Sequence, residues 1–170
     1  MMDGEGTLEL FAELFVAFAG FTALAGVILR SDMESALLRQ EVRLLLEYSL
    51  IYLVRATLPL VLFHAGLSES VSWRIACATS AAETVIYYAL RFGSLRSWLT
   101  SAGTAAFFWF TCTLDGLIVL LLLGAAVQLG PVPAHSLYLI HLLWGLIGTA
   151  LSFGRLVKPI WESSVGDPSA

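Results

Sequence analysis

Arg55, Glu83 and Asp115 are ionisable residues that stand inside long apolar segments of the chain. A guanidinium near the middle of a bilayer costs about 3 kcal/mol even on the mildest scale, and arginine cannot lose its proton to escape that cost. We therefore expect Arg55 to pair with Glu83, Asp115 or both. One cation facing two carboxyl groups leaves a negative charge for a proton or a cation to balance, which is the chemistry of a proton relay or a cation site.

Two hydroxyl-bearing residues extend this buried polar centre. Tyr52 precedes Arg55 by three residues and Thr111 precedes Asp115 by four, so each shares a helical face with its charged neighbour. Polar faces of this kind turn away from lipid, because hydrocarbon offers them no hydrogen bonds. A buried network that only fixes helix register would produce the same pattern, and both interpretations stay open.

A second polar layer is expected toward the outer ends of the helices. It contains Glu13 and Arg74, which could pair, and also His64 and His141. Histidines can bind a metal or ligate haem, so a haem or metal at His64 and His141 is a minor alternative. However, His135 and His141 are six residues apart and face different ways on a helix, which is not a metal-ligand spacing. We predict neither a metal nor a cofactor.

The elements that must position these residues are long and apolar. The chain has 170 residues, of which 58% are hydrophobic and 13% charged, and its mean hydropathy is +0.84. This composition predicts an all-α, polytopic integral membrane protein, a bundle of five transmembrane helices. The spans are expected at about 8–29, 42–65, 71–90, 105–129 and 136–156, each close to the roughly 20 residues that a bilayer requires. Residues 1–158 would form one transmembrane domain and 159–170 a short mobile cytoplasmic tail.

Basic residues predict the orientation of the bundle. They cluster after the first, third and fifth spans, at Arg30 and Arg39, at Arg91 and Arg96, and at Arg155 and Lys158. The positive-inside rule then places the N-terminus outside and the C-terminus in the cytoplasm, in the cell's inner (plasma) membrane. The net charge of -4 argues against a nucleic-acid partner, which calls for a basic surface.

Small residues at helical spacing predict close helix contacts. One stripe contains Ala19, Ala23 and Gly26, and another contains Gly145 and Gly148. Such stripes let two helix backbones approach closely in lipid. Packing within the chain and contact with another subunit would both use them.

Three classes of function remain open. The first is a homo-oligomeric channel or transporter for ions, protons or a small solute, with the buried polar centre on its path. The second is a non-catalytic structural or accessory subunit of a larger membrane complex. The third is a membrane redox or enzyme subunit that uses the outer histidines. The sequence carries no catalytic motif, which favours the first two; the partners would be lipid, further copies of the chain or another membrane protein.

The topology gives the first testable prediction. Reporter fusions near Ser97 and after Ala170 should report the cytoplasm, and fusions at residue 2 and near Pro131 the outside. Finding both termini on one side of the membrane would remove a span and overturn the expected depths of the polar residues.

Overall fold

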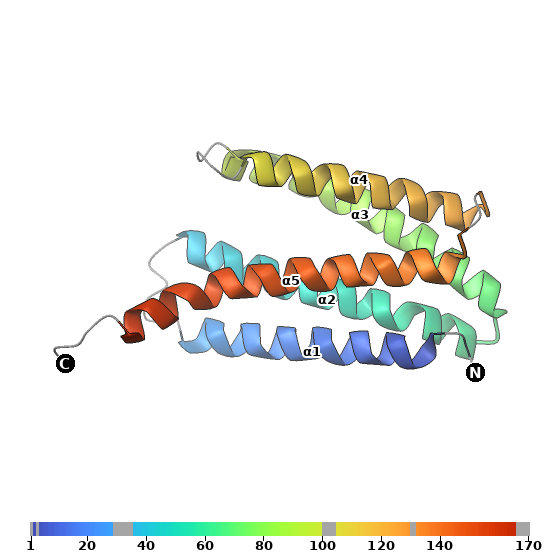
Figure 1. Cartoon of the computed structure of the whole chain (residues 1–170), viewed down its shortest axis with the longest axis horizontal. Helices are drawn as coiled ribbons and strands as arrows, with labels where there is room; N and C mark the ends of the chain where they lie inside the picture. The colour runs from blue at the N-terminus through green and yellow to red at the C-terminus, as the bar shows by residue number, and fades with distance from the viewer. Residues whose placement is uncertain (1, 3, 29–35, 100–104, 130–131, 166–170) are drawn as a thin grey trace. The chain divides into compact units, whose positions relative to one another are not determined.

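The computed structural model describes residues 2, 4–28, 36–99, 105–129 and 132–165, and its regular elements are all α-helices. The helices are α1 (Glu5–Ile28), α2 (Ala36–His64), α3 (Glu69–Leu99), α4 (Ala105–Ala126) and α5 (Ala134–Val165), as Figure 1 shows. The prediction of an all-α protein is confirmed for these residues.

Four of the helices are long and apolar enough to cross a membrane. The apolar stretches are Glu5–Val27, Val42–His64, Trp109–Ala126 and Ala134–Gly154, which correspond to the first, second, fourth and fifth predicted spans. Helix α3 contains the third predicted span, 71–90, but is not one of these four. It carries Arg74 and Glu83, which lower its hydropathy.

Two helices continue beyond the predicted ends of their spans. Helix α3 runs to Leu99 rather than to residue 90, and α5 runs to Val165 rather than to residue 156. Apolar composition marks only the part of a helix that lies in hydrocarbon, whereas backbone hydrogen bonding continues into the polar sequence that follows. The predicted tail, 159–170, therefore begins inside α5, and residues 166–170 lie outside the described part of the chain.

The chain forms two compact units, and α2 and α5 contribute to both. The α1–α2–α5 unit contains Gly4–Leu58 and Leu142–Ala170. The α3–α4 unit contains Met1–Asp3 and Pro59–His141, so it also has the last turns of α2 and the first turns of α5. A single domain over residues 1–158 stays a prediction.

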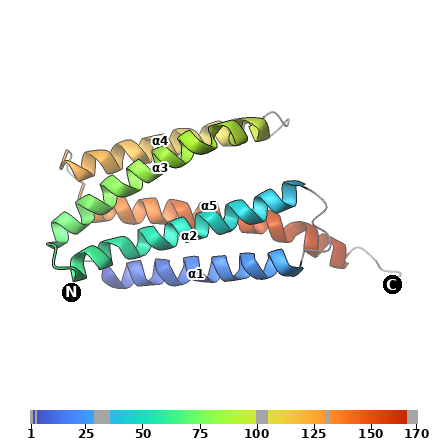
Figure 2. The same cartoon turned by 180° about the vertical axis from the view of Figure 1, so that it is seen from behind.

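The ring of Tyr52 organises the core of the α1–α2–α5 unit. On one side it stacks against Phe15 of α1, with ring centroids 5.3 Å apart. On another side it packs directly on Gly145 of α5, where a Cβ atom would overlap the ring. Phe18 of α1 meets Phe153 of α5 edge to face at 5.8 Å. Aromatic contacts thus link α1 to α2 and α1 to α5, and the three helices run alongside one another in Figure 2.

Buried hydroxyl groups in this unit are satisfied by their own helices. Thr22, Ser49 and Thr149 are each fully or almost fully buried, and each hydroxyl donates to the carbonyl oxygen four residues earlier, at 2.6–2.8 Å. Such bonds let short polar side chains remain in an apolar helix without a partner from another element.

In the α3–α4 unit, α3 and α4 lie side by side as an antiparallel hairpin (Figures 1 and 2). The first turns of α5 pack against the beginning of α3 through Tyr138, whose ring lies 5.7 Å from that of Trp73. The Ser80 hydroxyl donates to the Tyr138 hydroxyl at 3.2 Å, a bond between two fully buried residues. Polar bonds therefore cross between helices in this unit.

Two helix ends share one capping motif but use different residues. After α2, Gly66 adopts a φ of 96°, its N–H donates to Phe63, and the N–H of Leu67 donates to Leu62. After α4, Gln128 adopts a φ of 61° and makes the equivalent bonds with its neighbour Leu129. Both are Schellman caps, in which glycine is the usual residue at the left-handed position. Gln128 is therefore held in a conformation that is unfavourable for a residue with a side chain.

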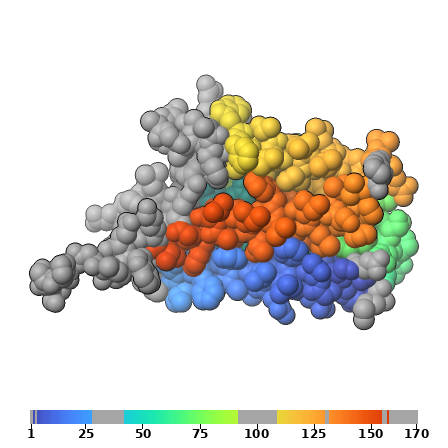
Figure 3. All heavy atoms as spheres, in the orientation of Figure 1, coloured from blue at the N-terminus to red at the C-terminus, as the bar shows by residue number. Residues whose placement is uncertain are grey.

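The outer faces of the apolar helices carry large exposed side chains. Helix α1, blue in Figure 3, exposes Leu10, Val16, Phe21, Leu24 and Val27 by more than half of their surface. Helix α4 exposes Leu117 and Leu120 to a similar or greater extent. Exposed apolar faces of this kind are compatible with contact with lipid hydrocarbon, as expected for membrane-spanning helices.

The contact between Tyr52 and Gly145 yields a second prediction. Gly145→Ala should lower the free energy of unfolding by about 1–3 kcal/mol, because the added methyl overpacks the Tyr52 ring. Gly154→Ala is the matched control on the same helix, since a Cβ there meets nothing within 4 Å. Thermal unfolding in mild detergent measures both, and equal stability of the two variants would contradict the close contact.

Candidate functional site

A hydrogen bond between Tyr88 of α3 and Asp115 of α4 lies inside the α3–α4 hairpin. The phenol of Tyr88 donates to Oδ2 of Asp115, and both side chains are half-buried. Asp115 is the one charged residue in the apolar stretch Trp109–Ala126. It lies six residues beyond Trp109, roughly 9 Å along the helix axis at about 1.5 Å per residue. The pair is therefore a polar site well inside a membrane-length helix.

Other polar groups border the pair. Cys112, one turn before Asp115 on α4, is half-buried on the same helix. Thr111 is half-buried on the same helix. The ring of Tyr87 meets that of Tyr88 at a centroid distance of 6.2 Å. Phenol, thiol and carboxyl groups are all able to give or take a proton, so this is the part of the hairpin best equipped for proton exchange.

Arg55 lies in the other unit, on α2. It is almost fully buried, at 4% exposure, and its guanidinium carbon lies 4.8 Å from the centroid of the Tyr52 ring. This is the geometry of a cation–π interaction, which stabilises a desolvated guanidinium by about 2 kcal/mol. Glu83 and Asp115 belong to the α3–α4 unit, so an ion pair between Arg55 and either carboxylate stays a prediction.

A proline follows Arg55 by four residues. Pro59 lies inside α2, is fully buried and has no N–H to give to the carbonyl oxygen of Arg55. It also marks the point at which α2 passes from one unit to the other. Helices of transporters are commonly interrupted near such polar positions.

Each residue of the predicted outer layer has its own surroundings in the structure. Glu13 is exposed on α1, and Nε of Arg74 donates to the carbonyl oxygen of Ala126, at 2.8 Å, at the end of α4. His64 is exposed, with Nδ1 2.8 Å from the carbonyl oxygen of Leu60. His141 is buried, and its ring lies 6.3 Å from that of Tyr138. A pair between Glu13 and Arg74 would join the two units and stays a prediction.

The described residues include no group of three or more His, Cys, Asp or Glu side chains that could hold a metal ion. Among the small residues, Gly26 approaches α2 closely, because a Cβ on it would lie 3.2 Å from Cγ1 of Val42. Ala19 is half-buried and Ala23 is exposed on the same helix. In the second stripe, Gly145 is a packing position and Gly148 is open.

Sequence reasoning did not select Tyr88, and the reason is the length of α3. With the third span ending at residue 90, Tyr88 would lie at the membrane boundary, far from the level of Asp115. In the structure Tyr88 is 11 residues before Leu99 and Asp115 is 10 residues after Ala105, so an antiparallel hairpin brings them to the same level. Counting from the ends of the helices, rather than from the ends of the apolar stretches, would have matched them.

No family model, no curated protein and no solved structure matches the chain.

The pair yields a third prediction. Tyr88→Phe should destabilise the protein by about 1–3 kcal/mol, because it removes a donor from a carboxyl group inside an apolar helix. Asp115→Asn combined with Tyr88→Phe should cost less than the sum of the single changes, as expected for groups in contact.

Thr113→Val is the matched control on α4, since the exposed Thr113 hydroxyl only donates to the carbonyl oxygen of Trp109 in its own helix. Thermal unfolding of the three variants and the double variant completes the cycle. Strictly additive losses would show that Tyr88 and Asp115 are not energetically coupled.

Proposed function

We propose that the protein is an oligomeric channel or transporter of the inner membrane that moves protons or small cations, with the Tyr88–Asp115 pair on the path. The observation that carries this proposal is the position of that pair. A carboxyl group inside an otherwise apolar helix is costly, by about 3 kcal/mol at mid-bilayer, and such residues commonly mark ion pathways or proton relays. Helix packing alone does not require a carboxyl group at this point.

The proposal treats α3 as a fifth span, in spite of its lower hydropathy. Three of its polar residues bond to other helices: Ser80 bonds to Tyr138, Tyr88 to Asp115 and Arg74 to the end of α4. A helix whose polar groups are satisfied by protein can cross a bilayer with a less apolar sequence. The distribution of basic residues supports an outer N-terminus and a cytoplasmic C-terminus for this arrangement.

Open small-residue positions support an oligomer. A Cβ atom placed on Gly20 of α1, Gly116 of α4 or Gly148 of α5 would meet no atom within 4 Å. Positions of this kind on apolar helices allow close approach of another helix. Association of several copies would also supply a path that a single chain of this length does not easily enclose.

A second candidate is a structural or accessory subunit of a membrane complex, and the surroundings of Arg55 favour it. Arg55 lies over Tyr52, the same ring that stacks on Phe15 and packs on Gly145. A cation fixed within the packing of three helices suits the maintenance of a fold better than the passage of an ion.

Ion flux separates the two candidates and is the fourth prediction. Protein reconstituted in liposomes with an internal pH dye or cation dye should collapse an imposed gradient. Asp115→Asn should lower the rate by about tenfold or more, since a barrier increase of about 1.4 kcal/mol suffices for that factor. Tyr88→Phe should lower it less, because it leaves the carboxyl group of Asp115 in place.

Thr113→Val, on the same helix, should conduct like the parent protein. No flux above that of empty liposomes, for a preparation that is folded and oligomeric, would sink the channel proposal. Recovery of the protein from native membranes in a stable complex with another membrane protein would then support the accessory subunit.

A further inference from the structure

Three hydroxyl-bearing residues follow one another along a single face of α3. Ser80, Thr84 and Tyr88 are spaced four residues apart, so the helix places them in one row, with neighbouring Cβ atoms about 5–6 Å apart. The row is about 12 Å long, at about 1.5 Å per residue. Ser80 is fully buried, and Thr84 and Tyr88 are half-buried, so this face is turned into the α3–α4 unit. We call these three residues the hydroxyl row.

Each end of the hydroxyl row is bonded to another helix. At one end the phenol of Tyr88 donates to Oδ2 of Asp115 on α4. At the other end the Ser80 hydroxyl donates to the phenol oxygen of Tyr138 on α5, at 3.2 Å. Between them the Thr84 hydroxyl donates to the carbonyl oxygen of Ser80, at 2.8 Å, and its own oxygen can accept. The row therefore runs from the carboxyl group in the apolar stretch of α4 to the first turns of α5.

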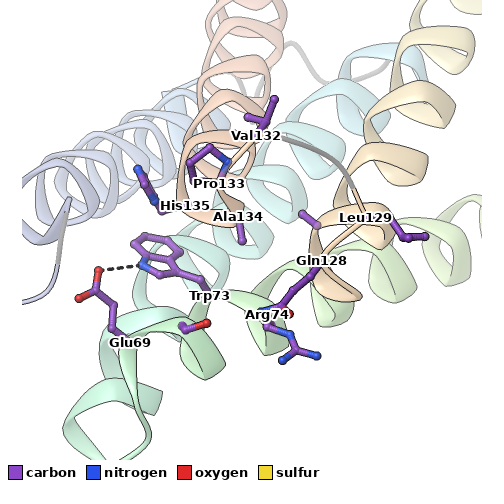
Figure 4. A pocket seen from close by; sticks show the side chains of 11 residues that line it. Glu69, Trp73, Arg74, Gln128, Leu129, Val132, Pro133, Ala134 and His135 are labelled. Atoms are coloured by element: carbon purple, nitrogen blue, oxygen red, sulfur yellow. Dashed lines mark hydrogen bonds between the residues drawn. The ribbon is translucent and has the colours of Figure 1, made fainter.

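A pocket opens beside the Tyr138 end of the row, between the beginning of α3, the end of α4 and the beginning of α5 (Figure 4). Its volume of about 610 Å³ is room for several water molecules. Its lining includes Trp73, whose buried ring lies 5.7 Å from that of Tyr138. The lining also includes Leu129 and Val132, which are exposed at 75% and 47%. The pocket thus reaches the protein surface on one side and the packing around Tyr138 on another.

His135 brings a proton-exchanging group to this pocket. Its ring lies 6.1 Å from that of Trp73, and Figure 4 shows the imidazole beside the indole. It precedes Tyr138 by three residues, so the two side chains share one face of α5. Histidine ordinarily gains and loses its proton between about pH 5 and 8, which lets it exchange protons with water in the pocket. The charged and titratable side chains of the lining are those of Glu69, Arg74 and His135.

The groups along the hydroxyl row suit a proton better than a metal cation. A hydroxyl both donates and accepts a hydrogen bond, so it can pass one proton on and take up another. A cation without its water shell requires several oxygen ligands at the same time, such as a ring of backbone carbonyls. Helices α3 and α4 are continuous beside the row, so their carbonyl oxygens accept from their own helices. In this part of the described chain, oxygens are therefore offered one at a time.

We propose that the transported ion is the proton, and that it passes between the pocket and Asp115 through Tyr138 and the hydroxyl row. The inference rests on the proposed channel or transporter function and names its ion and one part of its path. At each step an O–H bond of one group breaks and an O–H bond forms on the next oxygen or on a bridging water molecule. Each group then regains a proton from the neighbour behind it, so the row ends as it began. Oδ2 of Asp115 receives the proton that Tyr88 releases.

Proton flux into liposomes that contain a pH dye tests the path. Ser80→Ala and Tyr138→Phe each remove one buried hydroxyl and keep the rest of the side chain. Each should lower the rate by about tenfold or more, a modest factor for the loss of a positioned proton-transfer group. The double variant should be no slower than the slower single variant, because one interruption already closes the row. A purely structural role of this bond would instead lower thermal stability and leave the rate per folded protein unchanged.

Thr84→Val and Thr79→Val form a matched pair on α3. Both threonine hydroxyls donate to the carbonyl oxygen four residues earlier, at 2.8 Å, so both variants lose the same kind of bond within the helix. Thr84 belongs to the hydroxyl row, whereas Thr79 is exposed and lies outside it. Only Thr84→Val should slow the proton flux, again by about tenfold. This pair keeps the proposal testable if the Ser80 or Tyr138 variant does not fold.

A charged, membrane-impermeant thiol reagent tests the pocket as the entrance. Reaction at His135→Cys places a charged group in the pocket and should remove most of the proton flux of that variant. Ala65→Cys is the control, since Ala65 is exposed after the end of α2 and does not line the pocket. The parent protein treated with the same reagent controls for reaction at Cys77 and Cys112. Both controls should conduct as they do without the reagent.

The outcomes separate this proposal from the function on which it rests. Movement of Na⁺ or K⁺ by the parent protein in a cation-dye assay would overturn the proton as the ion and leave a channel or transporter. Parent-like proton flux in Ser80→Ala, Thr84→Val and Tyr138→Phe would overturn the path, and full flux in labelled His135→Cys would overturn the entrance. A folded parent protein that moves neither protons nor cations would overturn this proposal and the proposed function together.

Discussion

Hydrocarbon offers no hydrogen bonds, so every polar side chain on a membrane-length helix must find its partner within the protein. The chain meets this constraint in two ways. In the α1–α2–α5 unit, buried hydroxyls such as those of Thr22 and Thr149 bond to their own helices. In the α3–α4 unit, bonds cross between helices, from Ser80 to Tyr138 and from Tyr88 to Asp115. Helix α3, the least apolar of the helices discussed as spans, depends most on such partners.

The two units consequently differ in what their polar groups can do. Tyr52 holds α1, α2 and α5 together through aromatic and glycine contacts, and Arg55 is packed against its ring. Movement of Arg55 would disturb that packing. The Tyr88–Asp115 bond joins α3 to α4, and both of its side chains are half-buried rather than fully buried. This contrast is the physical reason why the proposal of proton or cation transport rests on the hairpin rather than on Arg55.

Helix α4 carries two polar features of the α3–α4 unit. Asp115 lies within its apolar stretch, and the cap at its end contains Gln128 and accepts the bond from Arg74. The cap satisfies the last carbonyl groups of the helix, and Nε of Arg74 donates to the carbonyl oxygen of Ala126.

Composition and hydrophobic segment length by themselves predicted an all-α membrane protein with five spans, because these properties depend only on the local run of apolar residues. In the described part of the chain the structure has helices at all five positions, and four of them, α1, α2, α4 and α5, are long and apolar enough to cross a membrane. Composition and segment length also identified Asp115 as a costly residue. The tertiary structure decided that Tyr88 is the hydrogen-bond partner of Asp115. Because α3 continues to Leu99, the register of the hairpin brings Tyr88 to the same height as Asp115. The same holds for the pocket, since its lining comes from the ends of three helices and Glu69 is far in sequence from Gln128 and His135. The local sequence pattern predicts which segments are apolar and how long each helix is. The hydrogen-bond partner of a side chain depends on the register between two helices and on the geometry of their ends, so it cannot be predicted from one segment alone.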